Sequence, residues 1–441
     1  MRSKGLLRFL IVFVIILFGL AGFVGYKAGV FDDLFPDLFT RETQIVDLSE
    51  SDSSNSGEAD LPSPSQSDER SDLGRSNEFL AKSGVGLSLT AQQADFLPPG
   101  EVIRKWPSVN GVTEDVTGGA PKLSDFKSQA NDPKPLTGAV IFLDCGHGGI
   151  DAGTVYPVYA PHEVLEKDIN IEIGKRLKPM LEEMGATVIM TRDTDDFISI
   201  YYRSAMVGEY FINEAKKNVL ATDPNANVSA LNSYQKHFDR IYELNQDSGG
   251  GDILGGVGQS RQTRMLYDIE NQFEHAIYLS LHCNFNEYYS DVGGMQVYYL
   301  DNGTLYDSVS EDVSYDMVAD PLQRVYPIYQ GYDDAGRQRL AELIYKETVA
   351  VVPALEVREA RPILTGDYAF LRCTGIDSVL VEMGFLSNSS DRTILSAPDG
   401  QEEVARGIAN GVYAYYCTGD TDDEASGEDS EAETVVEDDA G

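Results

Sequence analysis

The chain has 441 residues, of which 42% are hydrophobic and 24% are charged, with 72 acidic residues against 34 basic ones. This length accommodates one domain of ordinary enzyme size plus additional segments, and the apolar fraction is sufficient for a buried core. The formal net charge of −38 argues against nucleic acid as a partner, because phosphate groups require a basic protein surface.

An apolar segment near the amino terminus predicts a membrane anchor. Residues 6–26 are apolar almost throughout, and Arg2 and Lys4 precede them. The segment is long enough to cross a membrane, and its positive flank places residues 1–5 in the cytoplasm. We therefore expect a single-pass, membrane-anchored protein with an extracytoplasmic folded domain. Secretion after signal-peptide cleavage is the alternative, although the sequence has no clear A-x-A cleavage site.

Three further segments differ from a folded domain in composition. Residues 27–76 are rich in Ser, Asp, Glu and Asn, and we expect a disordered acidic tether, because such a segment buries too little apolar surface to offset its ordering entropy. Residues 77–137 are mixed, include Trp106, and are expected to be a partly ordered linker. Residues 418–441 form an acidic tail without a basic residue, which predicts a solvated, disordered terminus; a calcium or partner site is the alternative.

Residues 138–417 contain three short apolar runs, each with a polar residue at or near its end. The first run, 140–144, leads into a glycine loop that contains His147. The second, 276–281, is followed by His282, and the third, 379–381, by Glu382. Runs of this kind predict buried strands, and functional side chains commonly lie at strand ends or in the adjoining loops.

A fourth polar residue, Glu166, opens a predicted helix. The apolar residues that follow have the spacing of an amphipathic helix, which Gly185 ends: Ile169, Ile173, Leu177, Leu181 and Met184. Glu166 then lies in the first helical turn. In an open α/β sheet, this residue and the three at the strand ends can meet at one edge of the sheet.

These residue types suit metal-assisted hydrolysis. A catalytic zinc ion (Zn²⁺) binds three protein ligands and keeps a fourth position for water, and His147, Glu166 and His282 supply imidazole and carboxylate ligands of the right kind. Glu382 can act as the base that takes a proton from this water. The three ligand candidates also have structural alternatives. A loop histidine can be a helix cap or a hydrogen-bonding residue, and a strand-end histidine can be a satisfied core residue. Glu166 can be a glutamate that the helix dipole favours in the first turn.

The order of the motifs resembles the zinc-dependent N-acetylmuramoyl-L-alanine amidase family. The matching stretches between Gly138 and about Tyr416 are IFLDCGHGGIDAG, LEKDINIEIGKRL, ATVIMTRDTDDFIS, YLSLHCNFN, GGMQVYYL, DYAFLRCTGIDSVLVEMGFLSN and IANGVYAYY. The resemblance implies an α/β domain with a mixed, mostly parallel twisted sheet flanked by helices. It also implies zinc ligands at His147, Glu166 and His282, a catalytic role for Glu382, and peptidoglycan as the substrate.

The activity implied by the resemblance is hydrolysis of the amide bond between N-acetylmuramic acid and the L-alanine of the stem peptide. A zinc peptidase that cuts within peptidoglycan peptides would share the ligands and is an alternative. A non-catalytic wall-binding scaffold is another, but a binding module does not need the base Glu382. Glu163 competes with Glu166 as a ligand, and the LEKDIN match favours Glu166. His162, His237 and His275 lie in no matching context and are expected to be structural or exposed.

Two residues are candidates for substrate binding. Arg372 can pair with a substrate carboxylate through its planar guanidinium, and Asn284 can bond a substrate amide. Arg372 is also a candidate partner for Glu382 in a structural ion pair.

The sequence departs from the family pattern in two respects. First, the family usually has proline where this chain has Cys145 and a small residue where it has Cys283. These two cysteines stand beside the two histidines and are expected to be buried free thiols, with a disulfide between them as the alternative. Second, about seventy residues separate Arg203 from the strand of the second histidine. Arg203 and Arg264 both remain candidates for the family's arginine before the second histidine.

Residues 206–258 are predicted to be an insertion that ends in a flexible glycine linker. Long insertions beside a site are commonly lids, so we expect a lid, with solvated decoration as the alternative. A protein that regulates this insertion is a possible partner.

Overall fold

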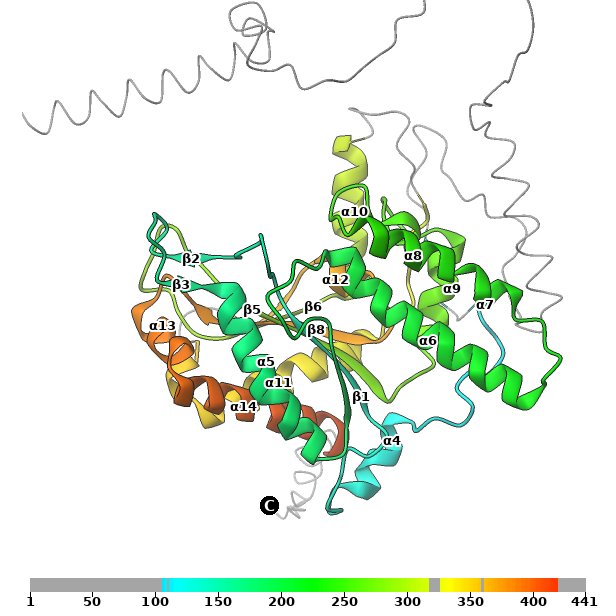
Figure 1. Cartoon of the computed structure of the whole chain (residues 1–441), viewed down its shortest axis with the longest axis horizontal. Helices are drawn as coiled ribbons and strands as arrows, with labels where there is room; N and C mark the ends of the chain where they lie inside the picture. Colours follow the sequence, from blue (N-terminus) through cyan, green and yellow to red (C-terminus); the bar gives the residue numbers. More distant parts are fainter. Residues whose placement is uncertain (1–104, 109–110, 317–325, 358–360, 419–441) are drawn as a thin grey trace, which may run out of the picture. The chain divides into compact units, whose positions relative to one another are not determined.

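A six-stranded mixed sheet forms the centre of the part that the computed structural model describes, which comprises residues 105–108, 111–316, 326–357 and 361–418 (Figure 1). The strand order is β4-β1-β5-β8-β6-β7, and all neighbours are parallel except β6 and β8. The strands are β1 (Val140–Cys145), β4 (Thr187–Met190), β5 (Ala276–Asn284), β6 (Gln296–Tyr299), β7 (Ile363–Thr365) and β8 (Asp377–Phe385). The predicted mixed, mostly parallel sheet is confirmed.

Helices flank this sheet. The longer ones are α5 (Glu166–Glu183), α6 (Ile200–Thr222), α8 (Gln235–Leu244), α9 (Arg261–Glu270), α10 (Asn302–Asp316), α11 (Asp334–Val351) and α14 (Pro398–Cys417). The shorter ones are α4 (Leu123–Phe126), η1 (Lys127–Gln129), α7 (Ser229–Ser233), η2 (Asp252–Leu254), η3 (Pro353–Leu355), α12 (Ala369–Arg372) and α13 (Ser389–Ser396). A separate antiparallel hairpin, β2 (Val155–Tyr156) and β3 (Val164–Leu165), precedes α5.

Alternate residues of the strands face two different helix layers, as the two-residue period of a strand requires. Phe142 and Tyr278 belong to a hydrophobic cluster that includes residues of α6, α8 and α9. Leu143 and Leu279 belong to a second cluster that includes residues of α5, α11 and α14. The two groups of helices lie on opposite sides of the sheet in Figure 1. The strands are therefore buried on both faces, which explains their continuous apolar character.

The predicted helix after Glu166 is confirmed. It spans Glu166–Glu183, and its apolar residues at three- and four-residue spacing are buried. The chain leaves the helix through Gly185, whose φ of 99° lies in the left-handed region that favours glycine. Because α5 packs on β1, β4 and β5, its first turn reaches the carboxyl-terminal edge of the sheet.

The segment predicted as an insertion is helical and contributes to the core. Helix α6 runs without a break through residue 206, and α7 and α8 follow it. Phe211, Tyr234, Phe238 and Ile241 are buried in the first hydrophobic cluster, so the segment is not solvated decoration. The predicted glycine linker at its end contains the 3₁₀ turn η2. The role of a lid stays a prediction.

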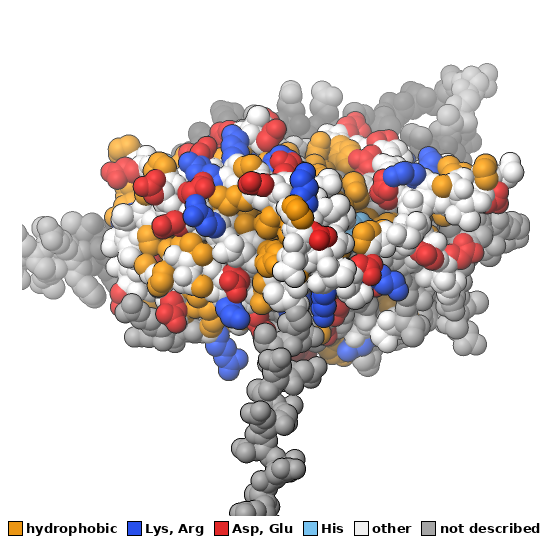
Figure 2. All heavy atoms as spheres, turned by 90° about the horizontal axis from the view of Figure 1, so that it is seen from below, with side chains coloured by type: hydrophobic (Ala, Val, Ile, Leu, Met, Phe, Trp, Pro, Cys, Tyr) orange, Lys and Arg blue, Asp and Glu red, His pale blue; other side chains and the backbone are white. Residues whose placement is uncertain are grey.

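The predicted anchor, tether and acidic tail lie outside the described residues, apart from Thr418 at the start of the tail. None of the helices that the structure describes is long and apolar enough to cross a membrane. Within the predicted linker, Trp106 is buried and its Nε1 donates a hydrogen bond of 2.8 Å to the carbonyl of Gln259. On the face shown in Figure 2, acidic and basic side chains are interspersed with hydrophobic ones, so that face has no large patch of a single charge.

Candidate metal centre

Three of the predicted site residues converge at the carboxyl-terminal edge of the sheet. His147 follows β1, Glu166 begins α5 and His282 lies near the end of β5, and one ligand atom from each lies within 4.8 Å of the others. Glu166 Oε1 is 3.1 Å from His147 Nε2 and 3.0 Å from His282 Nδ1. Among the residues described, this is the one group of histidine, cysteine and acidic side chains with the spacing of a metal site.

Glu166 is buried, and backbone groups from two other segments hold its carboxylate. Thr154 N donates to Oε2 at 2.7 Å, and Cys283 N donates to Oε1 at 3.0 Å. Burial alone raises the pKa of a carboxyl group, but the hydrogen bonds to His147 and His282 outweigh it and hold the pKa of Glu166 well below its ordinary value. The site therefore contains a fixed negative charge with little exposure to water.

His147 is oriented by its second ring nitrogen. Its Nδ1 is 2.7 Å from Asp151 Oδ2, so Nε2 faces Glu166. The residue has a φ of 63°, which the neighbouring glycines help the loop to reach. Burial opposes protonation, but the hydrogen bonds and charges of Glu166 and Asp151 raise the pKa of His147 to about 9. Asp151 was not among the predicted site residues. The acid four residues after the histidine in the HGGID stretch is the sequence signal that could have identified it.

His282 is held between Glu166 and an aromatic ring. Its ring stacks on Phe370 of α12, with centroids 5.7 Å apart and planes at 9°. The space is tight on another side, because a Cβ added to Gly146 would lie 2.2 Å from Cε1 of His282. The glycine after β1 is therefore required for the two histidine-bearing segments to approach each other.

Glu382 lies next to this cluster on β8, paired in register with His282. Its Oε2 is buried and has no hydrogen-bond partner. Burial raises the pKa of Glu382 to about 7, the charge of Glu166 adds to this effect, and His282 and His147 oppose it. The alternative ion pair with Arg372 is not formed, since Arg372 Nε lies 3.3 Å from Asp367 Oδ1 instead.

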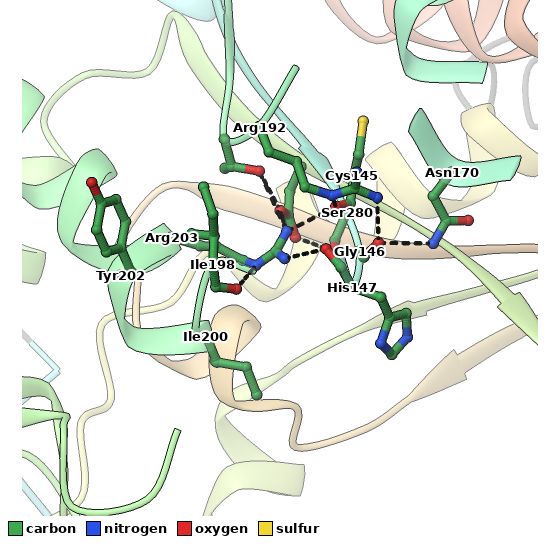
Figure 3. A network of polar contacts seen from close by, with 12 residues as sticks. Cys145, Gly146, His147, Asn170, Arg192, Ile198, Ile200, Tyr202, Arg203 and Ser280 are labelled. Atoms are coloured by element: carbon green, nitrogen blue, oxygen red, sulfur yellow. Dashed lines mark hydrogen bonds and ion pairs between the residues drawn. The ribbon is translucent and has the colours of Figure 1, made fainter. Parts of the chain in front are cut away.

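A buried polar network supports the His147 loop (Figure 3). Arg203 of α6 forms an ion pair with Asp144 of β1 and donates to the carbonyls of Cys145 and His147. Asp144 also accepts hydrogen bonds from Thr191 at 2.6 Å and Ser280 at 2.7 Å. Burial raises the pKa of Asp144, but the charge of Arg203 and these hydrogen bonds lower it to about 2.

A second arginine acts on the same backbone. Arg192, which follows β4, donates to the carbonyl of Cys145 at 2.8 Å and to that of Gly146 at 2.9 Å. Figure 3 shows both guanidinium groups converging on this segment while the imidazole of His147 points away from them. The predicted site did not include Asp144 or Arg192. A charged residue at the end of an apolar run was their only sequence signal.

The structure distinguishes the two arginine candidates. Arg203 donates a hydrogen bond of 2.7 Å to the backbone carbonyl of His147. Arg264 of α9 instead lies 3.4 Å from Asp268 and 5.2 Å from the centroid of the Trp106 ring. Arg203 is therefore the one that adjoins the candidate metal centre.

The two predicted substrate-binding residues have partners within the chain. Asn284 ends β5, donates to Gln296 Oε1 at 3.2 Å and accepts from Phe285 N at 2.8 Å. Arg372 ends α12 and pairs with Asp367. Their contacts with substrate stay a prediction.

The other histidines lie away from the cluster. His162 is 2.9 Å from the carbonyl of Pro157, His237 is 2.8 Å from Asp252 Oδ2, and His275 is buried beside Phe273. The competing ligand candidate, Glu163, is exposed and outside the metal-spaced group.

All four cysteines are buried free thiols, so the predicted free thiols are confirmed and the alternative disulfide between Cys145 and Cys283 is not present. Burial raises the pKa of Cys145 to about 12. A thiol with such a raised pKa is a poor metal ligand at neutral pH.

A cavity of about 280 Å³ lies at the opposite, amino-terminal end of β5 and β8. Glu270, Ile376, Asp377 and Tyr415 are among its lining residues, and none of the predicted site residues is. The cavity is therefore separate from the candidate metal centre.

Comparisons with known proteins agree with the family that the sequence motifs resemble. A family model described as N-acetylmuramoyl-L-alanine amidase matches residues 141–221 and 252–414. The N-acetylmuramoyl-L-alanine amidase AmiC of Escherichia coli is 26% identical over 290 residues, which are 64% of this chain and 54% of that protein. The chain thus spans about half the length of that relative.

Two further matches are similar in extent. The germination-specific N-acetylmuramoyl-L-alanine amidase of Bacillus subtilis is 24% identical over 282 residues, covering 64% of this chain and 81% of that protein. The solved structure of the CwlD amidase from Clostridioides difficile, in complex with the GerS lipoprotein, is 23% identical, with a TM-score of 0.36, covering 63% of this chain and 98% of that one. Because the family model matches more than half of the sequence, the chain belongs to the N-acetylmuramoyl-L-alanine amidase family.

Proposed function

We propose that this chain hydrolyses the amide bond between N-acetylmuramic acid and the L-alanine of the stem peptide in peptidoglycan, with a zinc ion held by His147, Glu166 and His282. The observation that carries the proposal is the buried, unpartnered Oε2 of Glu382 on the strand position paired with His282. Three ligand-type side chains and a carboxylate without a structural partner are the minimum set for metal-assisted amide hydrolysis.

The donor set fits zinc. Two imidazoles and one carboxylate are a common set of three protein ligands in catalytic zinc sites. Asp151 at His147 Nδ1 matches the acid that commonly orients a metal-bound histidine. The raised pKa of His147 beside the low pKa of Glu166 means that this environment favours an added positive charge.

In the proposed reaction, bound zinc supplies Lewis acidity and lowers the pKa of a water molecule. Glu382 accepts the proton of the attacking water and returns it to the L-alanine nitrogen as the amide bond breaks. A pKa of about 7 suits both transfers, because the group can take and release a proton near neutral pH. The stacking of Phe370 on His282 keeps this imidazole in place during the reaction.

The experiment that tests the function is digestion of purified peptidoglycan by the full chain, with mass spectrometry of the products. We expect intact stem peptides with a free L-alanine amino group, and lactyl carboxylates on the glycan. A chelator should abolish release, and added zinc should restore it. Products cut within the peptide would instead support the zinc peptidase, and the absence of any release by the zinc-loaded chain would support the scaffold. Release that persists in the chelator would contradict the metal mechanism.

We further propose that residues 6–26 anchor the protein in the membrane, with the catalytic domain outside the cytoplasm. The apolar composition of this segment and its positive flank support the proposal. Fractionation of cells followed by alkaline extraction tests it, because an anchored chain stays with the membrane and a chain cleaved at a signal peptide does not. A protein regulator that contacts the helices within residues 206–258 is a separate proposal, which affinity capture with and without these helices would test.

A further inference from the structure

The exposed large hydrophobic side chains of the described residues lie on three loops. All of them lie on loops next to the candidate metal centre: Ile150, Val158, Tyr159, Tyr288, Tyr289 and Val292. Tyr159 and Tyr288 are 86% and 84% exposed, values close to those of a side chain on an unfolded peptide. Hydrophobic side chains that gather on one surface mark a binding site more often than scattered ones do.

Two of these loops lead directly into the metal-ligand segments. The tip of the β2–β3 hairpin, residues 157–163, carries Tyr159, and β3 runs straight into Glu166. The loop 285–294 carries Tyr288 and Tyr289 and leaves β5 shortly after His282. The base of the hairpin contacts the end of β5, since Thr154 Oγ1 donates to the carbonyl of Cys283 at 3.4 Å. The bases of both loops therefore adjoin the metal centre.

The two loops are also fixed against the same helix, α13. The guanidinium of Arg392 lies 3.4 Å from the centroid of the Tyr156 ring in the hairpin. Asn388, the N-cap of α13, donates to the carbonyl of Asp291 in the other loop at 3.3 Å. The loops are thus held in place, and a ligand that binds to them pays little for ordering them.

The backbone of the second loop turns its tyrosines outward. Asn286 Oδ1 accepts hydrogen bonds from Tyr288 N at 3.0 Å and from Tyr289 N at 2.9 Å. In this turn, Tyr288 and Tyr289 are 84% and 65% exposed. Both rings are available to a partner.

The charges of the two loops select the kind of partner. Residues 157–163 and 285–294 contain Glu163, Glu287 and Asp291 but no lysine or arginine. Anionic lipid headgroups would be repelled here, because they bind basic segments. An uncharged polymer with apolar ring faces and many hydroxyl groups fits better, since a tyrosine offers an apolar face and a hydrogen-bonding tip.

We propose that Tyr159, Tyr288 and Tyr289 form a subsite for the glycan strand of the substrate, on the sugar side of the bond that is cut. The proposal rests on the proposed function, which requires sugar on one side of the metal centre and peptide on the other. The aromatic side has the surface that suits sugar rings.

The test measures binding to glycan strands from which all stem peptides have been removed, by co-sedimentation of the full chain. Because these strands lack the bond that is cut, the readout does not depend on activity. We expect the double variant Tyr288→Ser/Tyr289→Ser to bind about tenfold more weakly, since two stacking contacts are lost. The matched variant Tyr288→Phe/Tyr289→Phe keeps both rings and should bind within about threefold of the wild type. Equal metal content in all variants shows that the fold is intact.

Several results would overturn the subsite. Unchanged glycan binding by the Tyr288→Ser/Tyr289→Ser variant would overturn it. A variant that keeps its glycan binding but binds isolated stem peptides more weakly would also overturn it. Binding to phosphatidylcholine or phosphatidylglycerol vesicles that depends on the tyrosines would assign the surface to lipid, and a loss of self-association in sedimentation would assign it to a second copy of the chain. Tyrosine-dependent glycan binding without any amide cleavage would keep the subsite and reject the proposed function. Amide cleavage without tyrosine-dependent glycan binding would keep the proposed function and reject the subsite.

Discussion

His282 and Glu382 occupy paired positions on the neighbouring parallel strands β5 and β8. Neighbouring strands lie about 4.8 Å apart, and paired residues point to the same face, so this register places a proposed metal ligand beside the proposed base. A slip of one residue would turn one of the two side chains to the opposite face. The pairing becomes irregular between His282 and Asn284, immediately beyond this point.

Replacing Glu382 by Gln should abolish catalysis without removing the metal. Glutamine keeps the size of the side chain but cannot accept the proton of the water, so we expect a loss of about 10²- to 10⁴-fold in the rate of stem-peptide release. Metal analysis of the purified variant should give the wild-type zinc content. A variant that loses zinc together with activity would show that Glu382 is a ligand and not the base.

Replacing Asp151 by Asn should weaken metal binding. The carboxylate at 2.7 Å from His147 Nδ1 fixes the ring so that Nε2 faces the site, and removing its charge should lower zinc affinity by about 10- to 100-fold. Competition with a chromophoric chelator measures this affinity directly. The exposed Asp168→Asn on α5 serves as a control and should leave the affinity unchanged.

Replacing Arg203 by Met should destabilise the fold strongly. The change leaves the carboxylate of Asp144, which is 1% exposed, without its ion-pair partner, and we expect a loss of about 3–5 kcal/mol in the free energy of unfolding. Chemical denaturation monitored by circular dichroism gives this value. Arg176→Met breaks an exposed pair with Glu172 on α5 and should cost less than about 1 kcal/mol. Equal losses in the two variants would contradict the structural role of the buried pair.

Glu270 should make stability depend on pH. Burial raises its pKa to about 8 in the folded chain, against an ordinary value of 4.5. Between these values the unfolded chain has released the proton and the folded chain retains it, so the contribution of Glu270 to stability is full below about pH 4.5 and is lost as the pH rises towards 8.

The variant Glu270→Gln mimics the protonated form and should remove this dependence. Relative to the wild type, its free energy of unfolding should therefore increase with pH, by up to about 1.4 kcal/mol per pH unit inside this window. Denaturation curves at several pH values measure the difference. A difference between variant and wild type that stays constant across the window would show that the folded carboxyl group is already ionised.

Local patterns predicted the elements that carry the site. The spacing of Ile169, Ile173, Leu177 and Leu181 predicted α5, and short apolar runs predicted β1, β5 and β8. The strand β5 extends beyond its predicted run at the carboxyl-terminal end, and β8 extends at both ends. These signals are readable because helix and strand periods depend on the residues within one element. The segment 206–258 was harder to predict, since the polar residues of its helices obscured the buried face that contains Phe238 and Ile241.

By itself, the sequence determined which residue types are present for metal chemistry, and in which order along the chain: His147, Glu166, His282 and Glu382. Only the tertiary structure decided how they are supported. The Asp144 and Arg203 pair joins residues 59 positions apart, and the stacking of Phe370 on His282 depends on how α12 packs against the sheet. Such contacts follow from the packing of whole elements, because burial and charge pairing depend on neighbours that are distant in the sequence.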